Sequence, residues 1–311
     1  MGSEGQTGRD GNAGAREIAP GVHVFASPAY ALKSGVILGD GSRPFVRGGP
    51  PPDAPGPTPA LLVDPGYFPS DLDRISSFLS ARGAEPRWIV LTHSDWDHIA
   101  GPARFPAAMT VASSRFPDRV ADRRDSIVRS LEDFDRKLYV RRESIFEIPV
   151  ASSLVGAPSD LVWNGPRARL LPAGGHTPDG LMLLAGDSRV IFAGDHLSDL
   201  EIPFVGDSLA AYRETLSMVR RLAVRGEAET LVPGHGELCG RDGILDRIDE
   251  DEDYLDRLEQ WVRETRRTVD TLAGILERCD EVVFRKGWGN PDVHAGHRDN
   301  VALIGGALGM V

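Results

Sequence analysis

Cysteine is scarce in this sequence, and its scarcity limits the classes of protein to which the chain can belong. Only two cysteines occur among 311 residues, Cys239 and Cys279, and neither lies in a C-x-x-C motif. A fold held together by several disulfides is therefore excluded, and the composition suits a reducing cytoplasm. We expect each cysteine to serve as a small apolar residue.

Long apolar runs and an excess of positive charge are also missing. No apolar stretch is long enough to cross a bilayer, so we expect no membrane partner. The first residues, MGSEGQTGRDGNAGARE, lack the apolar core of a signal peptide, and we predict that residues 1–19 form a disordered tail. With 35 Lys and Arg against 46 Asp and Glu, the net charge of −11 argues against a broad nucleic-acid-binding surface.

Short apolar runs that are typical of strands occur in two batches, and each batch contains or is followed by a helical pattern. The Pro/Gly-rich stretch 41–59 is predicted to be an irregular excursion between neighbouring strands. The predicted strands are 21–27, 34–40, 59–66, 87–94, 109–114, 168–176, 180–187, 189–196 and 229–236, and the predicted helices are 70–83, 118–143 and 208–226.

From residue 241 onward the sequence is predicted to be mainly helical. Apolar residues recur there every seven positions, which is the spacing of a helix face that packs against a partner. We expect this stripe to dock on the parent domain, and a homodimer seam is the alternative. The stripe consists of Ile248, Leu255, Val262, Val269 and Leu276, with Leu258 and Leu272 three positions further on.

Residues 91–101, LTHSDWDHIAG, place two histidines and two aspartates within six positions directly after a predicted strand. Three further predicted strands end in the same kind of residue, because "LLPAGGH", "VIFAGD" and "LVPGH" each run into a histidine or an aspartate. Strands that end at one edge of a sheet would bring these side chains together, and imidazole with carboxylate suits zinc, iron or manganese. The residues concerned are His93, Asp95, Asp97, His98, His176, Asp195 and His235.

In their order and spacing, these motifs resemble the signature of the metallo-β-lactamase-fold superfamily, in its glyoxalase II-like branch. The matching stretches are "HSDWDH", "GGHTPDG", "FAGD" and "PGHG", and Asp64 of "LLVDPG" corresponds to an earlier aspartate of that family. The resemblance implies an α/β fold, a four-layer αββα sandwich. It covers a catalytic domain over 20–240, with a C-terminal helical extension over 241–311.

The resemblance also implies a dinuclear metal site and a set of roles. One metal would be held by His93, the residue at position 95 and His176, and the other by Asp97, His98 and His235. Asp195 would bridge the two ions, and Asp97 would be the catalytic residue that orients the attacking hydroxide. The cofactors expected are two divalent metal ions, zinc first, with manganese or iron as alternatives.

Asp95 stands where most of the superfamily has histidine. A carboxylate on the same Cβ can still reach a metal, but a harder ligand favours iron or manganese relative to zinc. Three carboxylates plus a hydroxide would neutralise two divalent ions, which predicts weaker Lewis acids. The alternative is that Asp95 points away and only one metal binds tightly.

Four other residues near or beyond the motifs also invite interpretation. Asp179 stands where glycine is common and is expected to alter the turn or its hydrogen bonds, while His196 is expected to line the pocket or support the ligands rather than to bind metal. His294 and His297 are expected to be ordinary surface histidines, with a place in the cleft as the alternative.

The apolar residues Phe68, Trp96, Ile202, Pro203 and Phe204 lie near the motifs in sequence and favour an apolar or acyl-bearing small molecule, with core packing as the alternative for each. We therefore expect a cytoplasmic metallohydrolase that cleaves a small ester, thioester or lactone with metal-bound hydroxide. The alternative is an iron-dependent oxygenase on the same fold, similar to a persulfide dioxygenase. A third reading is a non-catalytic protein that holds a metabolite in the cleft.

Overall fold

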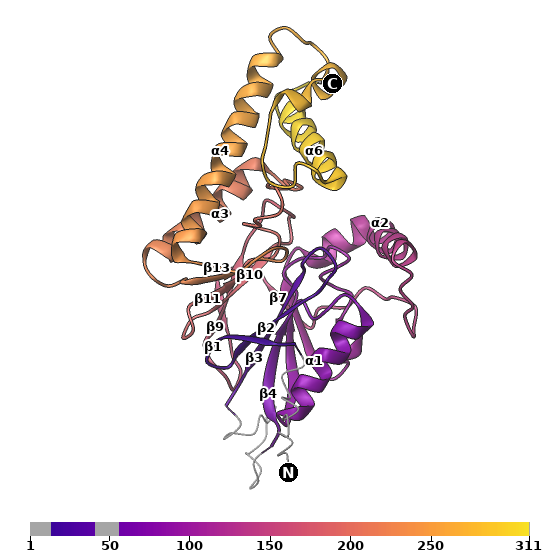
Figure 1. Ribbon diagram of the computed structural model, residues 1–311, viewed down its shortest axis with the longest axis vertical. Helices are drawn as coiled ribbons and strands as arrows, with labels where there is room; N and C mark the ends of the chain where they lie inside the picture. Colours follow the sequence, from indigo (N-terminus) through magenta and orange to yellow (C-terminus); the bar gives the residue numbers. More distant parts are fainter. Residues whose placement is uncertain (1–13, 41–55, 311) are drawn as a thin grey trace, which may run out of the picture.

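The computed structural model describes residues 14–40 and 56–310, and two β-sheets occupy its centre (Figure 1). The strands of the first sheet lie in the order β1(Arg16–Ala19), β2(Val22–Ala26), β3(Lys33–Leu38), β4(Thr58–Val63), β5(Ala84–Val90), β6(Met109–Ser113) and β7(Ser153–Val155). The strands of the second sheet lie in the order β13(Cys239–Gly240), β12(Thr230–Val232), β11(Val190–Phe192), β10(Leu181–Ala185), β9(Ala168–Pro172) and β8(Ser159–Leu161).

The two sheets are packed face to face, and the alternation of side chains along each strand explains how both faces of each sheet are buried. In β4, Leu61 and Val63 face the second sheet, whereas Leu62 faces the helices outside the first sheet. In β10, Leu183 belongs to the core between the sheets and Leu184 to the core beneath the outer helices. A strand that is apolar at consecutive positions is therefore buried on both sides.

Helices cover the outer face of each sheet, which makes the four-layer αββα sandwich that the sequence predicts (Figure 1). On the first sheet lie α1(Pro69–Ala81) and α2(Phe116–Lys137), with the short helix η1(Pro102–Arg104) between them in sequence. On the second sheet lie α3(Leu209–Val224) and the beginning of α4(Arg241–Thr265).

The directions of the strands determine where the functional side chains meet. In the first sheet β4 and β5 are parallel, and in the second sheet β11 and β12 are parallel. β10 lies between β9 and β11 and is antiparallel to both, so β9 and β11 run in the same direction. The carboxyl ends of β9, β11 and β12 therefore lie at one edge. Hydrogen bonds join the two sheets at this edge, since Leu181 N–H donates to the Thr92 carbonyl at 2.6 Å and Lys33 N–H to the Gly234 carbonyl at 2.8 Å.

The C-terminal segment continues as α4, α5(Leu272–Leu276), the short helix η2(Cys279–Glu281) and α6(Pro291–Ala307). Figure 1 shows α4 and α6 rising beyond the sandwich beside each other. Ile248, Leu255, Leu258 and Val262 are completely buried in a core that is continuous with that of the second sheet. These four stripe residues dock on their own chain, as the sequence predicts, and Val269 lies beyond the end of α4. Across residues 14–40 and 56–310, no helix combines the length and the apolar character that a membrane crossing needs.

Several predicted boundaries are wrong in detail. The predicted tail 1–19 ends too late because Arg16–Ala19 form β1, whereas residues 1–13 lie outside the described part of the chain. The excursion 41–59 also ends too late, since β4 begins at Thr58, and its residues 41–55 are likewise outside the described part. The predicted helix 118–143 stops at Lys137, because Tyr139 adopts a left-handed backbone with φ of 57°.

His297 is not the surface histidine that the sequence predicts. Its side chain is 0% exposed, with Nδ1 2.8 Å from the Tyr254 hydroxyl and Nε2 3.0 Å from the Cys279 carbonyl. It is a hydrogen-bonded core residue of the extension. His294 lies nearer the surface, against the rings of Phe284 and Trp288.

Candidate metal centre

The seven predicted site residues lie together at the edge where the carboxyl ends of the strands meet, and they form two groups. Within each group, one potential ligand atom from every side chain lies within 4.8 Å of the others. The first group consists of His93, Asp95, His176 and Asp195, and the second of Asp97, His98 and His235.

The first group is arranged around Asp95. Its Oδ2 atom lies 3.4 Å from His93 Nε2 and 3.3 Å from His176 Nε2. Asp95 therefore directs one carboxylate oxygen into the site and does not point away from it. Its side chain is 30% exposed, which makes it the most open member of the cluster.

Asp195 lies between the two groups and turns a different oxygen to each. Its Oδ2 atom is 3.5 Å from the Nε2 atoms of both His93 and His176. Its Oδ1 atom is 3.0 Å from His98 Nε2 and 3.4 Å from His235 Nε2. This is the arrangement that a carboxylate needs in order to bridge two ions.

The second group completes the site from the other side. Asp97 Oδ2 lies 3.2 Å from His235 Nε2 and 3.8 Å from His98 Nε2, and the two Nε2 atoms are 3.4 Å apart. Asp97 is 12% exposed, whereas His98 is completely enclosed. Asp97 thus lies where the second group opens toward solvent.

The ring nitrogens that face away from the centre have partners of their own. His176 Nδ1 is 3.0 Å from the Phe204 carbonyl, and His235 Nδ1 is 3.0 Å from the Tyr30 carbonyl. A carbonyl can only accept, so each Nδ1 carries a proton and each Nε2 is left facing the centre, where an ion could take the place of its proton. Such outer partners are typical of histidines that bind metal.

Asp64, the counterpart of the earlier family aspartate, has a similar role for His98. Its Oδ2 atom lies 2.9 Å from His98 Nδ1, and its two oxygens accept hydrogen bonds from the Thr92 N–H and hydroxyl at 2.9 and 2.6 Å. Asp64 itself adopts an unfavourable φ of 42°, directly after β4. A strained backbone of this kind persists only where the surrounding structure holds the residue in place. Here the surroundings hold Asp64 against His98.

The charges of the cluster favour a cation at its centre. Burial acts to lower the pKa of His93, and the nearby His98 acts in the same direction. The carboxylates of Asp195 and Asp95 outweigh both and raise this pKa to about 9. Burial acts to raise the pKa of Asp195, but His98 and His235 hold it well below its usual range. The concentration of negative charge that draws protons to these rings draws metal ions in the same way.

Two polar atoms of the cluster that lack well-aligned hydrogen bonds also favour a bound metal ion. In the part of the chain that the structure describes, His93 Nε2 is a buried atom with no hydrogen-bond partner, and Asp195 Oδ1 faces two imidazole nitrogens without a well-aligned hydrogen bond. Burying such atoms without a partner is unfavourable, and a bound ion would satisfy both. Imidazole and carboxylate donors suit zinc, iron or manganese at either group.

His196 lies beside the cluster but belongs to neither ligand group. Its ring packs against Tyr212, with centroids 4.8 Å apart, and its Nε2 atom is buried. Burial, helped by the nearby His176, lowers the pKa of His196 to about 3. His196 is therefore neutral, and it lines the site beside His176, whose ring centroid is 6.2 Å away, as the sequence predicts.

Aromatic rings line the side of the second group. Trp96, which lies between two ligand candidates in sequence, packs against Phe134 and Tyr67 with centroids 4.7 and 5.2 Å apart. Tyr30 packs against Phe134 at 5.0 Å and presents its ring to His235 at 6.3 Å. We call these four rings the aromatic wall. Of the predicted apolar residues, Trp96 belongs to it and Phe68 packs beside it.

Phe204 and its neighbours Ile202 and Pro203 have a different place, because they pack with the C-terminal extension. The residue that holds them, Asn300 on α6, was not singled out from the sequence. Its Oδ1 accepts from Val205 N–H at 2.8 Å, and its Nδ2 donates to the Pro203 carbonyl at 2.6 Å and the Tyr254 hydroxyl at 3.1 Å. Since Phe204 supplies the carbonyl that fixes His176, α6 is connected to the first group through two hydrogen-bonded steps.

Replacing Asn300 by alanine is expected to destabilise the protein and to loosen His176. The buried N–H of Val205 and the carbonyl of Pro203 would lose their partners, at roughly 1–3 kcal/mol for each group. Chemical denaturation should report a loss of about 2–6 kcal/mol in the free energy of unfolding, with weakened metal binding at the first group. The exposed Gln260, changed to alanine, is the control. A variant as stable as this control would contradict the assigned role.

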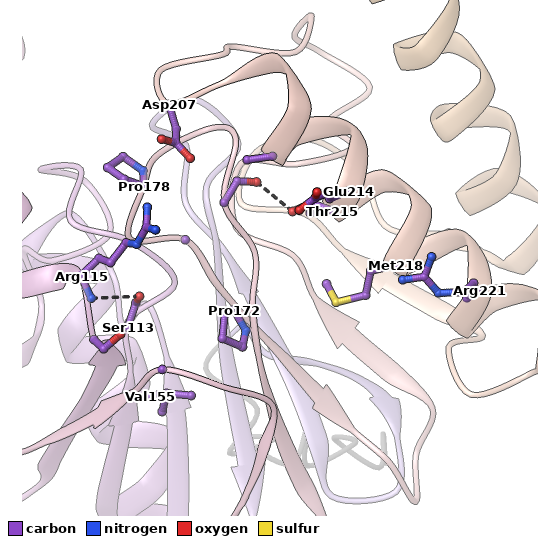
Figure 2. Close-up of a pocket in the computed structure, with 15 residues that line it drawn as sticks. Ser113, Arg115, Val155, Pro172, Pro178, Asp207, Glu214, Thr215, Met218 and Arg221 are labelled. Carbon is purple, nitrogen blue, oxygen red and sulfur yellow. Dashed lines mark hydrogen bonds between the residues drawn. The ribbon is translucent and has the colours of Figure 1, made fainter.

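A polar cavity of about 400 Å³ lies behind the loop that carries His176 (Figure 2). Figure 2 shows Arg115 and Ser113 on one side of it and Glu214, Thr215 and Met218 of α3 on the other. The loop residues Gly174, Pro178 and Gly180 form part of its lining, but none of the seven cluster residues does. This cavity adjoins the candidate metal centre without containing it.

Comparison with known proteins agrees with this geometry. The sequence model of the metallo-beta-lactamase superfamily matches residues 54–235. A beta-lactamase-like protein 2 homolog of Caenorhabditis elegans is 26% identical over 198 residues, which cover 61% of this chain and 56% of that protein. The chain spans about half the length of the curated relatives it matches.

Solved structures share the fold at low sequence identity. The sec-alkylsulfatase Pisa1 of a Pseudomonas species is similar with a TM-score of 0.68 and 14% identity, over 96% of this chain and 50% of the alkylsulfatase. A beta-lactamase domain protein of Burkholderia ambifaria gives a TM-score of 0.66 and 15% identity, over 95% of this chain and 88% of its own. Since the superfamily's sequence model matches more than half of its residues, the chain belongs to the metallo-β-lactamase superfamily.

Proposed function

We propose that this protein is a metal-dependent hydrolase that cleaves a small ester, thioester or lactone, and that it uses two divalent metal ions. The observation that carries the proposal is the position of Asp195, which turns one oxygen to each of two ligand groups. Membership of a superfamily whose members are mostly hydrolytic metalloenzymes supports it.

Seven residues would hold the two ions, with Asp195 shared between His93, Asp95 and His176 on one side and Asp97, His98 and His235 on the other. When bound, such ions lower the pKa of a water molecule and polarise a carbonyl oxygen. Asp97, at the opening of the second group, is placed to accept a hydrogen bond from the attacking water and to hold it. The histidines keep their Nε2 lone pairs directed inward because their Nδ1 protons are bonded elsewhere.

The preference for a substrate with an acyl or apolar portion rests on the aromatic wall. Tyr30 and Trp96, the two rings of the wall that are only partly buried, would provide an apolar surface beside the second group for the part of the substrate that does not react. A secondary alkyl sulfate, the class that the name of the Pseudomonas enzyme indicates, also has an apolar portion and belongs in the test.

An iron-dependent oxygenase, similar to a persulfide dioxygenase, is the second candidate because of one feature of the first group. His93, Asp95 and His176 offer two imidazoles and one carboxylate, which is the donor set of many non-haem iron oxygenases. Consumption of oxygen by the iron-loaded protein would favour this function over hydrolysis.

The setting of the activity is part of the proposal. We propose a cytoplasmic location, on the evidence of two unpaired cysteines, and a small-molecule substrate rather than a nucleic acid. A homodimer stays a prediction.

The proposal is tested by loading the purified protein separately with zinc, manganese and anaerobic Fe²⁺. Each form is assayed against an aryl ester, an acyl thioester, a lactone, a secondary alkyl sulfate and, on an oxygen electrode, glutathione persulfide. We expect hydrolysis of an ester, thioester or lactone by the zinc or manganese form. Oxygen uptake by the iron form alone, with no hydrolysis by any form, would replace our first function by the second.

A further inference from the structure

We propose that Arg119 is a positioning residue that makes Asp95 a one-oxygen metal ligand, and that the buried Asp179 holds Arg119 in that position. The inference rests on the metal centre of the proposed function. It concerns a residue of the charge-rich helix α2 that neither the motifs nor the superfamily comparison single out.

The two oxygens of Asp95 have separate partners. Oδ2 faces the first group, 3.3 Å from His176 Nε2 and 3.4 Å from His93 Nε2. Oδ1 accepts a hydrogen bond from Arg119 Nη2 at 2.5 Å. Because the guanidinium occupies Oδ1, this carboxylate has a single oxygen left for an ion, as an imidazole would have a single nitrogen. A charge-assisted hydrogen bond of this length also fixes the rotation of the carboxylate.

Arg119 is itself held from two further directions. Its Nη1 donates to the hydroxyl of Ser94, which is completely buried, at 2.6 Å. Its Nε lies 3.5 Å from Asp179 Oδ1, and the Asp179 side chain is 0% exposed. All three guanidinium nitrogens are thus engaged by this chain, so Arg119 is arranged to orient a ligand rather than to bind a substrate.

The charge of Arg119 also stabilises the buried carboxylate of Asp179. Within residues 14–40 and 56–310, neither oxygen of its buried carboxylate has a hydrogen-bond partner, and Arg119 is its ion-pair partner. A buried carboxylate without a compensating charge is strongly unfavourable. The two positions at which the sequence departs from the superfamily motifs, 95 and 179, are therefore the two carboxylates that meet at one arginine.

The guanidinium also changes what Asp95 can give to a metal. It holds Oδ2 in the direction of the first group, so the carboxylate has little rotational freedom left to lose when an ion binds. If Arg119 is removed, the carboxylate is free to rotate, and its orientation must be fixed at the moment when an ion binds. Metal affinity at the first group should then fall, while the second group, which does not contact Arg119, should be unaffected.

The experiment measures metal affinity and needs no substrate. Arg119→Gln is titrated with zinc against a chromophoric chelator, beside Arg123→Gln, the same substitution at an exposed position one turn along α2. We expect Arg119→Gln to lose roughly 10–100-fold in affinity at one site, the range that outer partners of metal ligands give, with the other site unchanged. Arg119→Lys, which keeps the charge, should recover part of the loss.

Two more variants keep the test decisive. Asp179→Asn, which keeps the shape of the side chain, should give a smaller loss at the same site even if Arg119→Gln folds poorly. In an Asp95→His background, Arg119→Gln should change affinity by less than about threefold, because the acceptor of its hydrogen bond is gone.

Three results have separate meanings. If Arg119→Gln and Asp179→Asn both bind zinc with the affinity of the control Arg123→Gln, the inference is overturned and the proposed function is left intact. Two-site zinc binding with the expected loss, but without hydrolysis of any substrate, supports the inference and overturns the hydrolase. Wild-type protein that takes up no metal overturns both.

Discussion

Replacing Asp195 by asparagine is expected to remove most of the hydrolytic activity and to reduce the metal content from two ions to one or fewer. Asparagine keeps the shape of the side chain, but its amide group cannot turn a charged oxygen to both groups, as Asp195 does at 3.0 Å from His98 and 3.5 Å from His93. Stabilisation of the transition state by a metal amounts to several kcal/mol. Since about 1.4 kcal/mol is a factor of ten, we expect a fall in kcat/KM of about 10³-fold.

The control is Asp133→Asn, the same substitution at an exposed position on α2. Metal content and kcat/KM are measured on both variants with the substrate that the panel identifies. An Asp195→Asn enzyme that keeps two ions and at least a tenth of the wild-type activity would show that Asp195 is not the bridge.

Replacing Gly234 by alanine is expected to have the second largest effect, because this glycine lies against the cluster itself. A Cβ atom at this position would lie 2.2 Å from Asp195 Oδ1 and 2.9 Å from His98 Cε1. The backbone has little freedom to retreat, since Gly234 N–H donates to the Gly194 carbonyl at 2.6 Å and the Gly234 carbonyl accepts from Lys33 N–H at 2.8 Å. The added methyl group must therefore displace the ligand candidates.

We expect Gly234→Ala to lose at least about 100-fold in metal affinity. This is the upper end of the loss that replacing an outer partner of a metal ligand causes, because here the ligands themselves are displaced. Overpacking should lower the free energy of unfolding by only about 1–3 kcal/mol. A cobalt(II) titration followed by visible absorption measures the first, and thermal unfolding measures the second. Gly306→Ala on α6, where a Cβ meets nothing within 4 Å, is the matched control. A cobalt spectrum equal to that of the control would contradict the arrangement described for Gly234.

Much of the site could be predicted because strand ends are easy to recognise. His176, Asp195 and His235 each follow an apolar run that ends in glycine, and parallel strands bring such ends to one edge. The four layers follow from the same runs, since strands apolar at consecutive positions are buried on both faces. The order of the motifs, through the resemblance to the superfamily, predicted which residues belong to each of the two ligand groups.

Other parts could not be predicted because their signals are tertiary. Arg119 is one of many charged residues on α2, and only its position opposite Asp95 and Asp179 distinguishes it. Asn300 is a single amide on a helix, and its role depends on a loop 95 residues earlier in sequence. His297 was expected at the surface because its neighbours in sequence are polar, but the fold of the extension buries it.

The shortest strands escaped prediction for a related reason. β7 and β8 contain three residues each, include exposed polar positions, and are the edge strands that pair with β6 and β9. Local sequence carries little information about such strands, since their hydrogen bonds come from a partner far along the chain.

The central claim, that this chain holds two metal ions between Asp195 and the six other cluster residues, is tested most directly by counting the ions. Protein purified without chelator and without added metal is analysed by mass spectrometry for metal content per chain, and analysed again after reconstitution with zinc, manganese and iron. We predict close to two divalent ions per chain, which fall to one or fewer in Asp195→Asn. A wild-type chain that holds no metal even after reconstitution would contradict the account.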